Sequence, residues 1–311
     1  MKIIYLFFIS LFSFSLQAQD IANFLQGGNV PWTTFEFENM WMPKQRLDAG
    51  PDKTDVVYRH FFLSQQILKA EKVTLGLSAR YQKLDLNKEV GILRDYYNIQ
   101  FGGSFTYTLE DKRFWSLSYS HGSASDEPFD KARDTVDSAN FIYKYNDRWF
   151  FVANYSNNRA FLNGIPLPGF FYVKEMTRER MLILGFPFVL WKTPLSEKFS
   201  FTFFGLLPWS YRAKVSYEIS PFLKPYIGFE QMPQSYFRSD RSDRFDRFFW
   251  VERRVGLGVE GGITRQLKFD LSGGLAFDRQ FFEARNFSEK KNSLYNLENG
   301  LYTSLTIKAS F

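Results

Sequence analysis

The sequence predicts an all-β protein, a single up-and-down antiparallel transmembrane β-barrel of 14 strands, with 12 strands as the alternative count. Three observations lead to this fold class. Apolar and polar residues alternate over long segments, aromatic residues gather near segment ends, and short and long polar connections alternate along the chain. Strands of soluble β-sandwiches also alternate, but they usually span about 5–6 residues, whereas a tilted strand needs about 9–11 residues to cross a bilayer.

The composition favours a membrane-facing wall over a soluble core. Aromatic residues make up 20% of the 311 residues and include 37 Phe, yet 23% of residues are charged. Rings this abundant in a polar chain must be spread over a surface, and a barrel wall does this because every second residue faces lipid. The net charge of +6 is mild and both signs are mixed along the chain, so we expect no nucleic-acid partner. Without cysteine there is no disulfide and no lipidation at an N-terminal cysteine.

Residues 1–18 are predicted to be a cleaved signal peptide, and residues 19–311 the barrel. Lys2 provides the positive start, Ile3–Phe14 is an apolar run of about a dozen residues, and Ala18 suits the position before a cleavage point. The alternative is a buried helix or an anchor, but the run is shorter than the roughly 20 residues that span a bilayer. The rest of the chain contains no comparable apolar stretch of 18 residues, which excludes a helical membrane protein.

The strands are predicted from period-two alternation. In 72–82 the odd positions are apolar or aromatic and the even positions are polar or Gly, and 97–109, 115–120 and 267–278 repeat the pattern. The full set of predicted strands is 32–42, 56–68, 72–84, 96–109, 114–123, 138–145, 148–157, 180–189, 198–207, 211–219, 223–232, 248–263, 266–281 and 300–311. Between 148 and 232 the pattern is interrupted, because Phe150 and Val152 are apolar on the expected polar face and Pro187, Pro208 and Pro225 intervene.

The connections predict the orientation. The tight turns are Lys69–Glu71, Glu110–Arg113, Asn146–Asp147 and Thr264–Arg265, and the longer polar loops are 43–55, 85–95, 124–137, 158–179, 233–247 and 282–299. Short periplasmic turns and long extracellular loops are typical of outer-membrane barrels, and an even strand number places both ends in the periplasm. Tryptophans expected at the lipid–water boundaries are Trp41, Trp115, Trp149, Trp191, Trp209 and Trp250.

The last segment, 301–311, carries a resemblance. Leu301, Leu305, Ile307, Ala309 and Phe311 share one face, and the chain ends on the aromatic ring. This segment resembles the final strand of Gram-negative outer-membrane β-barrel proteins. The resemblance implies a bacterial outer-membrane location and recognition of Phe311 by the barrel-assembly machinery. In addition, 166–169 (Pro-Leu-Pro-Gly) and 185–188 (Gly-Phe-Pro-Phe) look like features of an uncharacterised barrel family, which implies no particular activity.

Charged residues on the predicted polar face are candidates for lining the lumen. They are Glu36, Glu38, Arg80, Arg212, Lys214, Glu218, Glu252, Arg254, Glu260, Lys268, Asp270, Asp278 and Lys308. One interpretation is that they pair across the barrel and stabilise its interior; the other is that they line an aqueous path for small polar solutes. Charges at membrane depth must be paired or hydrated in either case, and we favour pairing.

A second candidate is the pair His121 and Ser123. Its His-x-Ser spacing is similar to that of the outer-membrane phospholipase family, and a base and a nucleophile two residues apart lie on the same face of a strand. The chain departs from that family's pattern, because Ser-Ala-Ser at 123–125 replaces Ser-Asn-Gly and Asn140 falls on the opposite face. The simpler interpretation is a strand-end histidine beside a loop serine.

The third candidate is a loop in which Arg and Asp recur at three-residue steps. Arg238, Arg241, Arg244 and Arg247 belong to it. Either the loop is solvated and paired with itself, which we favour, or these guanidinium groups bind phosphates of lipopolysaccharide. The sequence contains no metal-ligand cluster, and we expect no cofactor.

The function expected from the sequence is a passive, porin-like pore for small polar solutes or a structural membrane component, and not an enzyme. The alternatives are a lipid-acting hydrolase that uses His121 and Ser123, or a surface binder or adhesin acting through loops 158–179 and 233–247. The expected partners are the lipid bilayer, lipopolysaccharide and the assembly machinery.

Overall fold

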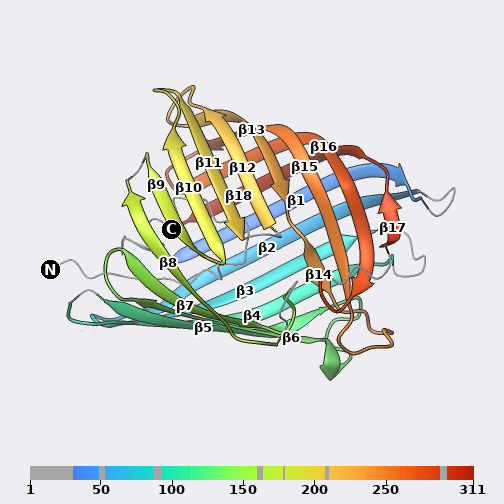
Figure 1. Cartoon of the computed structure of the whole chain (residues 1–311), viewed down its shortest axis with the longest axis horizontal. Coiled ribbons are helices and arrows are strands. Elements are labelled where there is room, and N and C mark those ends of the chain that lie inside the picture. The colour runs from blue at the N-terminus through green and yellow to red at the C-terminus, as the bar shows by residue number, and fades with distance from the viewer. Residues whose placement is uncertain are drawn as a thin grey trace.

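The computed structural model is a closed antiparallel β-barrel (Figure 1). It describes residues 31–48, 53–86, 93–111, 113–159, 164–177, 179–206, 210–287 and 293–311. The predicted signal peptide, 1–18, lies outside the described residues. In the described ranges no helix is long and apolar enough to cross a membrane.

Sixteen strands form the wall. They are β1 (Thr33–Arg46), β2 (Lys53–Lys69), β3 (Val73–Asp85), β4 (Tyr96–Thr108), β5 (Phe114–Ser125), β6 (Thr135–Lys144), β7 (Trp149–Ser156), β8 (Leu167–Met176), β9 (Met181–Phe186), β10 (Phe188–Pro194), β11 (Phe199–Leu206), β12 (Ser210–Tyr217), β13 (Leu223–Gln231), β15 (Arg247–Gly262), β16 (Leu267–Ala284) and β18 (Gly300–Ser310). Two short strands, β14 (Gln234–Tyr236) and β17 (Ser293–Leu297), pair with β15 and β16 beyond the ends of β13 and β18. A 3-10 turn, η1, covers Ala132–Asp134.

The wall closes where the first strand meets the last. β1 pairs with β18 in antiparallel register, and the Thr33 and Phe311 backbones exchange two hydrogen bonds of 3.1 and 2.9 Å. Closure has a physical reason, because an open sheet edge in hydrocarbon would leave a row of N–H and C=O groups without partners. β1 begins and β18 ends on the side of the tight turns, which we call the inner end. The opposite side, with the longer loops, is the outer end.

The strand count differs from both predicted values: the wall has 16 strands, not 14 or 12. β8 lies inside the segment expected to be loop 158–179, and the single strand expected at 180–189 is two strands joined at Pro187, which follows a cis peptide bond. Residues 170–173 are apolar on both faces of β8, so the period-two signal is absent there. Since the number is still even, both ends lie at the same end of the barrel as expected.

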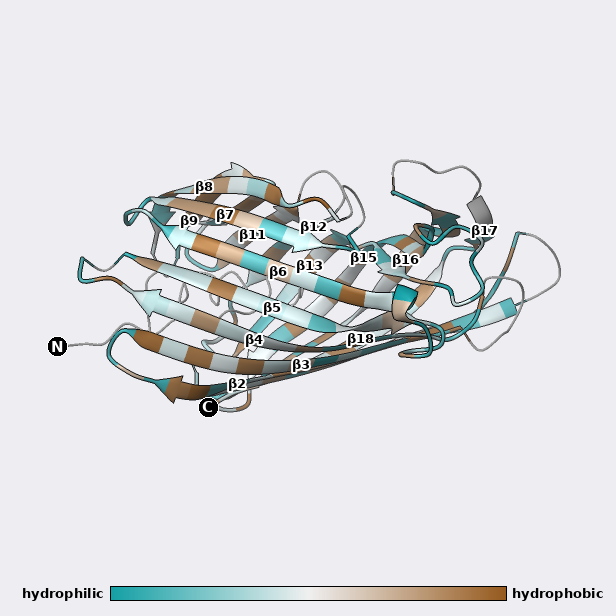
Figure 2. Cartoon of the chain, turned by 90° about the horizontal axis from the view of Figure 1, so that it is seen from below, coloured by the Kyte–Doolittle hydropathy of each residue, from teal (hydrophilic) through white to brown (hydrophobic). Residues whose placement is uncertain are grey.

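The outward face of the wall is apolar, as the alternating brown segments of Figure 2 show. Leu77, Phe101 and Leu257 lie at the middle of their strands and are 53%, 62% and 68% exposed. Side chains of this kind are stable on the surface only where lipid covers them. The wall therefore has the polarity of a transmembrane barrel.

The predicted tryptophans differ in their positions. Trp41, Trp149 and Trp191 are exposed on the outward face and Trp115 is partly exposed there, whereas Trp209 lies outside the described residues. The expectation for Trp250 was wrong, because its ring is only 2% exposed and packs inside the barrel 5.8 Å from the Tyr58 ring. β15 continues beyond the membrane-facing part of the wall, and its inward residues there become core.

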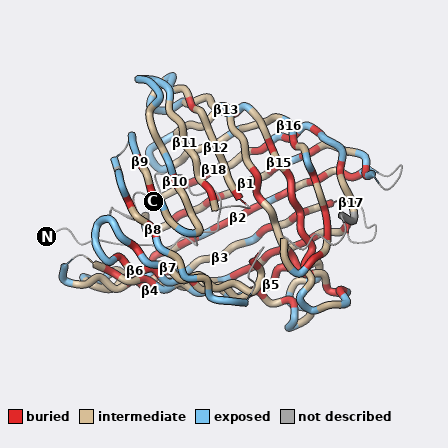
Figure 3. Tube along the Cα trace, viewed as in Figure 1, coloured by how far each residue is buried: buried red, intermediate tan, exposed pale blue. Residues whose placement is uncertain are grey.

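The interior near the outer end is filled by side chains. Buried residues gather there, on the same side as β17 in Figure 3. Tyr96 on β4 stacks on Phe248 of β15 with ring centroids 4.2 Å apart, although these strands are not neighbours in the wall. We call this cluster the outer core; it consists of Met40, Met42, Leu47, Val56, Tyr58, Leu84, Leu86, Leu93, Tyr96, Ala124, Val136, Tyr236, Phe237, Phe248, Trp250, Ala276, Phe281, Leu297 and Tyr302.

A second apolar cluster covers the inner surface of β5 to β10. We call it the wall core; its residues are Phe114, Ile142, Phe150, Phe171, Val173, Met181, Ile183 and Leu190. Phe150 belongs to it, and Val152 packs against it, so these two residues do face the interior. The polar face expected at these two residues is therefore wrong, because the lumen beside the inner-end part of β6–β10 is apolar.

Candidate functional site

The charged residues of the lumen form a chain of ion pairs from β12 to β16. Arg212 contacts Glu230 at 2.7 Å, and Glu230 contacts Arg254 at 3.0 Å. Glu252 contacts two arginines, Arg254 at 3.1 Å and Arg279 at 3.3 Å. The signs alternate along the chain, which is the arrangement that low-dielectric surroundings require. The pairing interpretation therefore describes this side of the lumen.

A second cluster of charged residues lies beside this chain of ion pairs and borders a cavity. Lys214 Nζ contacts Asp270 at 2.8 Å and Glu260 at 3.4 Å, and the Tyr226 hydroxyl donates to Asp270 at 2.5 Å. β13 and β15 lie between β12 and β16 in the wall, so the Lys214–Asp270 contact spans the inner surface of these two strands. A cavity of about 50 Å³ adjoins these residues and Glu38. The lining of this cavity is polar enough for small polar solutes, and within it Lys214 is paired with Asp270 and Glu260.

Two of the predicted lumen residues lie elsewhere. Asp278 was expected in the lumen, but β16 has a bulge opposite Val251–Arg253, and Asp278 adopts a φ of 49°. This backbone turns Asp278 out to an ion pair with exposed Arg253 at 3.0 Å and places Arg279 inside in its stead. Glu218 lies at the turn after β12, half-exposed, and pairs with Lys224 at 2.8 Å. A bulge shifts the alternation by one residue, so sequence periodicity alone misassigns the residues beyond the bulge.

The remaining predicted lumen residues lie on inward positions of their strands. Arg80 faces the Phe62 ring at 5.9 Å, Glu36 lies 3.9 Å from His60, and Lys268 is opposite Lys308 in the register of β16 and β18.

A ladder of uncharged polar side chains, most of them amides, lines the inner surface of β2 to β7. The sequence analysis did not identify it. Its members are Tyr58, Gln82, Asn98, Gln100, Ser120, Ser118, Asn140 and Asn154. Asn98 Nδ2 donates to Gln82 Oε1 at 2.7 Å, and Gln100 Nε2 donates to Asn98 Oδ1 at 2.7 Å. Uncharged amides carry no sign pattern, so only their neighbouring positions in the wall reveal them. The ladder runs from Tyr58, which also belongs to the outer core, to Asn154, which lies beside Ile142 and Phe171 of the wall core.

The two proline–glycine motifs come together beside the wall core. Gly169 on β8 pairs with Val152 on β7, and Phe170 pairs with Phe186 on β9. A Cβ on Gly169 would lie 2.3 Å from the Phe186 carbonyl oxygen, and one on Gly185 would lie 2.3 Å from that of Phe170. The two glycines thus allow β8 and β9 to approach closely, and the hairpin at Pro187 ends β9 after only six residues.

This arrangement borders an apolar pocket with a cavity volume of about 50 Å³. It is lined by Asn140, Phe141, Ile142, Val152, Ala153, Asn154, Arg159, Leu167, Phe171, Phe186, Pro187, Phe188, Phe204 and Leu206. Its lining has the composition of small-molecule sites, which are mostly apolar with a few polar groups that orient the ligand.

Arg159 is the charged residue of the pocket, and its side chain is almost fully buried. Its guanidinium donates to the Asn154 side-chain oxygen at 2.8 Å and to the Ile165 carbonyl at 2.6 Å. Burial lowers the pKa of Arg159 because the cation has lost hydration. The described lining residues include no carboxylate, so the pocket has a positive end.

His121 and Ser123 share the outward face of β5, as expected, but they have different partners. His121 Nδ1 lies 2.8 Å from Asp137 Oδ1, and the Tyr119 hydroxyl donates to the same oxygen at 2.5 Å. Ser123 is fully buried: its hydroxyl donates to the Asp134 carbonyl at 3.3 Å and accepts the Phe129 N–H at 3.2 Å. The structure therefore supplies a carboxylate for the histidine but directs the serine into a loop.

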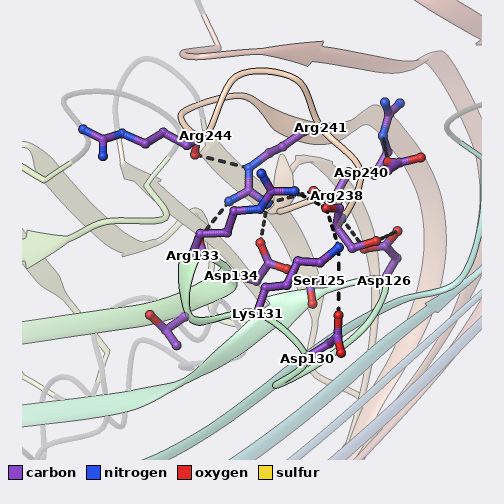
Figure 4. Close-up of polar contacts among 12 residues, drawn as sticks. Ser125, Asp126, Asp130, Lys131, Arg133, Asp134, Arg238, Asp240, Arg241 and Arg244 are labelled. Atoms are coloured by element: carbon purple, nitrogen blue, oxygen red, sulfur yellow. Dashed lines mark hydrogen bonds and ion pairs between the residues drawn. The ribbon is translucent and has the colours of Figure 1, made fainter.

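The arginine loop folds over the 126–134 loop instead of extending into solvent (Figure 4). Arg241 forms a buried ion pair with Asp134 and donates to the Arg133 carbonyl at 2.7 Å. Arg94 links the two loops by pairing with Asp126 at 2.7 Å and Asp240 at 3.1 Å. The ion pairs of this loop are thus made mainly with other segments. A surface binder acting through 233–247 would have to use the part of the loop that these contacts leave exposed.

The four lipopolysaccharide candidates differ in exposure. Arg241 and Arg247 are buried, and Arg247 donates to the Asn157 carbonyl at 2.6 Å. Arg238 pairs with Asp240 and with Glu283 at 2.5 and 3.3 Å. Arg244 is exposed and lies over the Phe245 ring at 4.5 Å. Lipopolysaccharide binding stays a prediction, and in this conformation Arg244 is the member of the set that can reach a phosphate.

Across the described ranges no group of three or more His, Cys, Asp or Glu side chains is placed to hold a metal ion.

The closed wall, its apolar outward face and its polar and apolar interior define a β-barrel of the outer-membrane type. No protein-family model matches the chain, and no curated protein matches it either. Similar solved structures include an outer membrane channel from Pseudomonas putida F1 (9% identity, 91% of this chain, 96% of that chain, TM-score 0.38). A bacterial polysaccharide outer membrane secretin is similar at 10% identity (91% and 99% covered, TM-score 0.43), as is the toluene transporter TodX of P. putida at 8% (93% and 92% covered, TM-score 0.38). These similarities concern the fold alone.

Proposed function

We propose that this protein is an outer-membrane transport barrel whose lumen is sealed at the outer end in its resting state, so that it is not a constitutively open porin. The observation that carries this proposal is the outer core. Rings from opposite walls, such as Tyr96 and Phe248, are in direct contact there. Buried rings that stack across a lumen leave no continuous water path between them.

The interior below the outer core supports transport over a purely structural role. A structural barrel needs only a filled core, whereas this lumen contains two cavities of different chemistry, one bordered by Lys214 and Asp270 and one lined by apolar side chains. The polar cavity supports small polar solutes as the transported molecules. Passage of any solute would require the outer core to separate.

Conductance in a planar bilayer tests the proposal. We expect wild-type protein to show little steady conductance, because the outer core is closed. Truncating both rings of the Tyr96–Phe248 stack (Tyr96→Ala with Phe248→Ala) should raise the frequency of conducting events about tenfold, which corresponds to roughly 1.4 kcal/mol lost from the closed state. Phe101→Ala, on the outward face, is the control. A large ohmic conductance of the wild type would contradict the proposal.

A second candidate is a lipid-acting hydrolase. The observation that favours it is the His121–Asp137 contact, because a carboxylate that holds Nδ1 orients the ring for general-base catalysis. Against it stands the buried Ser123 hydroxyl, which the loop contacts occupy. Hydrolysis would therefore require the 126–134 loop to move away from β5.

The location and assembly partners are also proposals. The apolar outward face supports insertion in a bacterial outer membrane, since closed barrels of this kind satisfy every backbone group within lipid. Phe311 is exposed at the inner end of β18, where it is accessible for binding by the assembly machinery. Replacing Phe311 with Ala should lower the amount of assembled protein in the outer membrane without changing the stability of protein refolded in detergent.

A further inference from the structure

We propose that the apolar pocket of β6–β11 binds a single-chain amphiphile with an anionic head group, such as a long-chain carboxylate. The chain lies against the inner surface of β6–β11, and the head group meets Arg159. This inference goes beyond transport and does not depend on whether the outer end opens.

The pocket departs from ordinary packing. Protein interiors are close-packed, and voids larger than a water molecule are few. Here a cavity of about 50 Å³, larger than one water molecule needs, lies beside Ile142, Val152 and Phe204, and the wall core continues the apolar surface below it. An apolar surface of this kind gains free energy when an aliphatic chain replaces water against it.

The polar groups of the pocket gather at one end. Arg159 contacts Asn154, and Asn154 contacts Asn140, so a guanidinium and two amides form a single polar patch. The described residues that line the pocket add no negative charge to this patch. A carboxylate head group would add charge-assisted hydrogen bonds to the guanidinium, and such bonds are about twice as strong as neutral ones. An uncharged head group would lack this contribution.

The pocket also adjoins the lipid-facing surface. Phe186 lines the pocket, yet its side chain is 51% exposed on the outward face next to Phe170. β9 has only six residues. Such a strand rises about 20 Å along its axis, less than the ~25 Å apolar band of a membrane barrel even before tilt. The hairpin at Pro187 therefore lies at membrane depth, where an amphiphile in the bilayer could reach the pocket beside Phe186.

Binding to protein in phosphatidylcholine nanodiscs tests the inference, with laurate and the uncharged dodecanol as probes. Wild-type protein should bind both saturably and laurate more tightly. Arg159→Gln should weaken laurate binding about tenfold, the loss of one charge-assisted contact, and leave dodecanol within twofold. Arg148→Gln, an exposed arginine of the inner-end turn, is the matched control and should change neither.

A substitution that fills the pocket tests the apolar part of the proposed binding site. Leu206→Trp should reduce the binding of both probes at least tenfold, because the indole occupies the chain site. Val189→Trp, on the outward face of the neighbouring β10, should have no effect. A diazirine-bearing fatty acid should crosslink to peptides containing residues 152–154, 167–171 or 204–206 of the wild type, a readout that needs no variant to fold.

Three results would overturn the proposal: no saturable laurate binding, an equal loss for laurate and dodecanol in Arg159→Gln, or wild-type crosslinks confined to outward residues such as Phe101 and Leu257.

Discussion

Arg241 and Asp134 form an ion pair from which solvent is almost completely excluded, with side chains 1% and 0% exposed, although 107 residues separate them in the chain. The pair joins the loop after β14 to the turn before β6. These two segments, 126–134 and 237–247, which we call the lid, adjoin Val136 and include Phe237 of the outer core. A buried charge is tolerated only with its partner, so each residue of the pair determines the position of the other.

Removing one partner should therefore loosen the lid strongly. Asp134→Ala leaves the Arg241 cation buried without its counter-charge, which typically costs about 3–5 kcal/mol in the free energy of unfolding. We expect faster tryptic cleavage within 237–247 and a lower urea midpoint. Arg244→Ala, in the same loop but exposed, should change stability by less than about 0.5 kcal/mol. Equal effects of the two variants would show that the buried pair is not what holds the lid.

The lid should also respond to acid. Partial burial would raise the pKa of Asp240, but the guanidinium groups of Arg238 and Arg94 outweigh it and lower the pKa below its usual value. A carboxyl with a lowered pKa stabilises the folded state above its unfolded pKa and loses that contribution as the pH falls through the folded pKa. Protease protection of 237–247 should thus persist at pH 5 and decline below the usual range of Asp. Asp240→Asn should reduce this dependence; an unchanged profile would assign it to other groups.

The outer core should be sensitive to loss of a single ring. Phe248→Ala removes a fully buried side chain that stacks on Tyr96 and Phe281, and such truncations cost about 3–5 kcal/mol. Urea unfolding in detergent measures the loss. Phe245→Ala is the control, because the Phe245 side chain is half-exposed in the lid. A change below about 1 kcal/mol for Phe248→Ala would mean that the outer core is not packed as described.

The additional strand β8 can be tested directly because the natural chain has no cysteine. Single cysteines at positions 170–173, each carrying a spin label, should alternate in accessibility. Labels at 170 and 172 face outward and should be accessible to oxygen in lipid, whereas those at 171 and 173 face the wall core and should not. Uniform exposure to a water-soluble reagent would instead indicate a loop and contradict the 16-strand wall.

The hydrolase candidate makes a different prediction. If His121 acts as a base in lipid hydrolysis, His121→Ala and Ser123→Ala should each abolish the release of fatty acid from phospholipid, and Asp137→Asn should lower it by orders of magnitude. Because the Ser123 hydroxyl is held by the 126–134 loop, we expect no release by the wild type. Release that is lost in all three variants would establish the enzyme.

Local sequence alone determines much of this barrel. Period-two alternation in segments such as 72–82 and 97–109 identified the long strands and their outward faces, because lipid and lumen act on successive residues with opposite polarity. The same alternation, combined with the tight turns, predicted that both ends lie on one side. Nothing beyond neighbouring residues is needed for these features.

The tertiary structure alone decided the rest. β8 and β9 carry no alternation because the lumen beside them is apolar, so both of their faces favour the same residues. The Asp278 bulge, the pairing of Arg241 with Asp134 and the meeting of Arg159 with Asn140 and Asn154 all depend on which distant strands closure of the barrel brings together. A periodic pattern reports the polarity on each side of a strand, but it carries no information about what lies across the lumen.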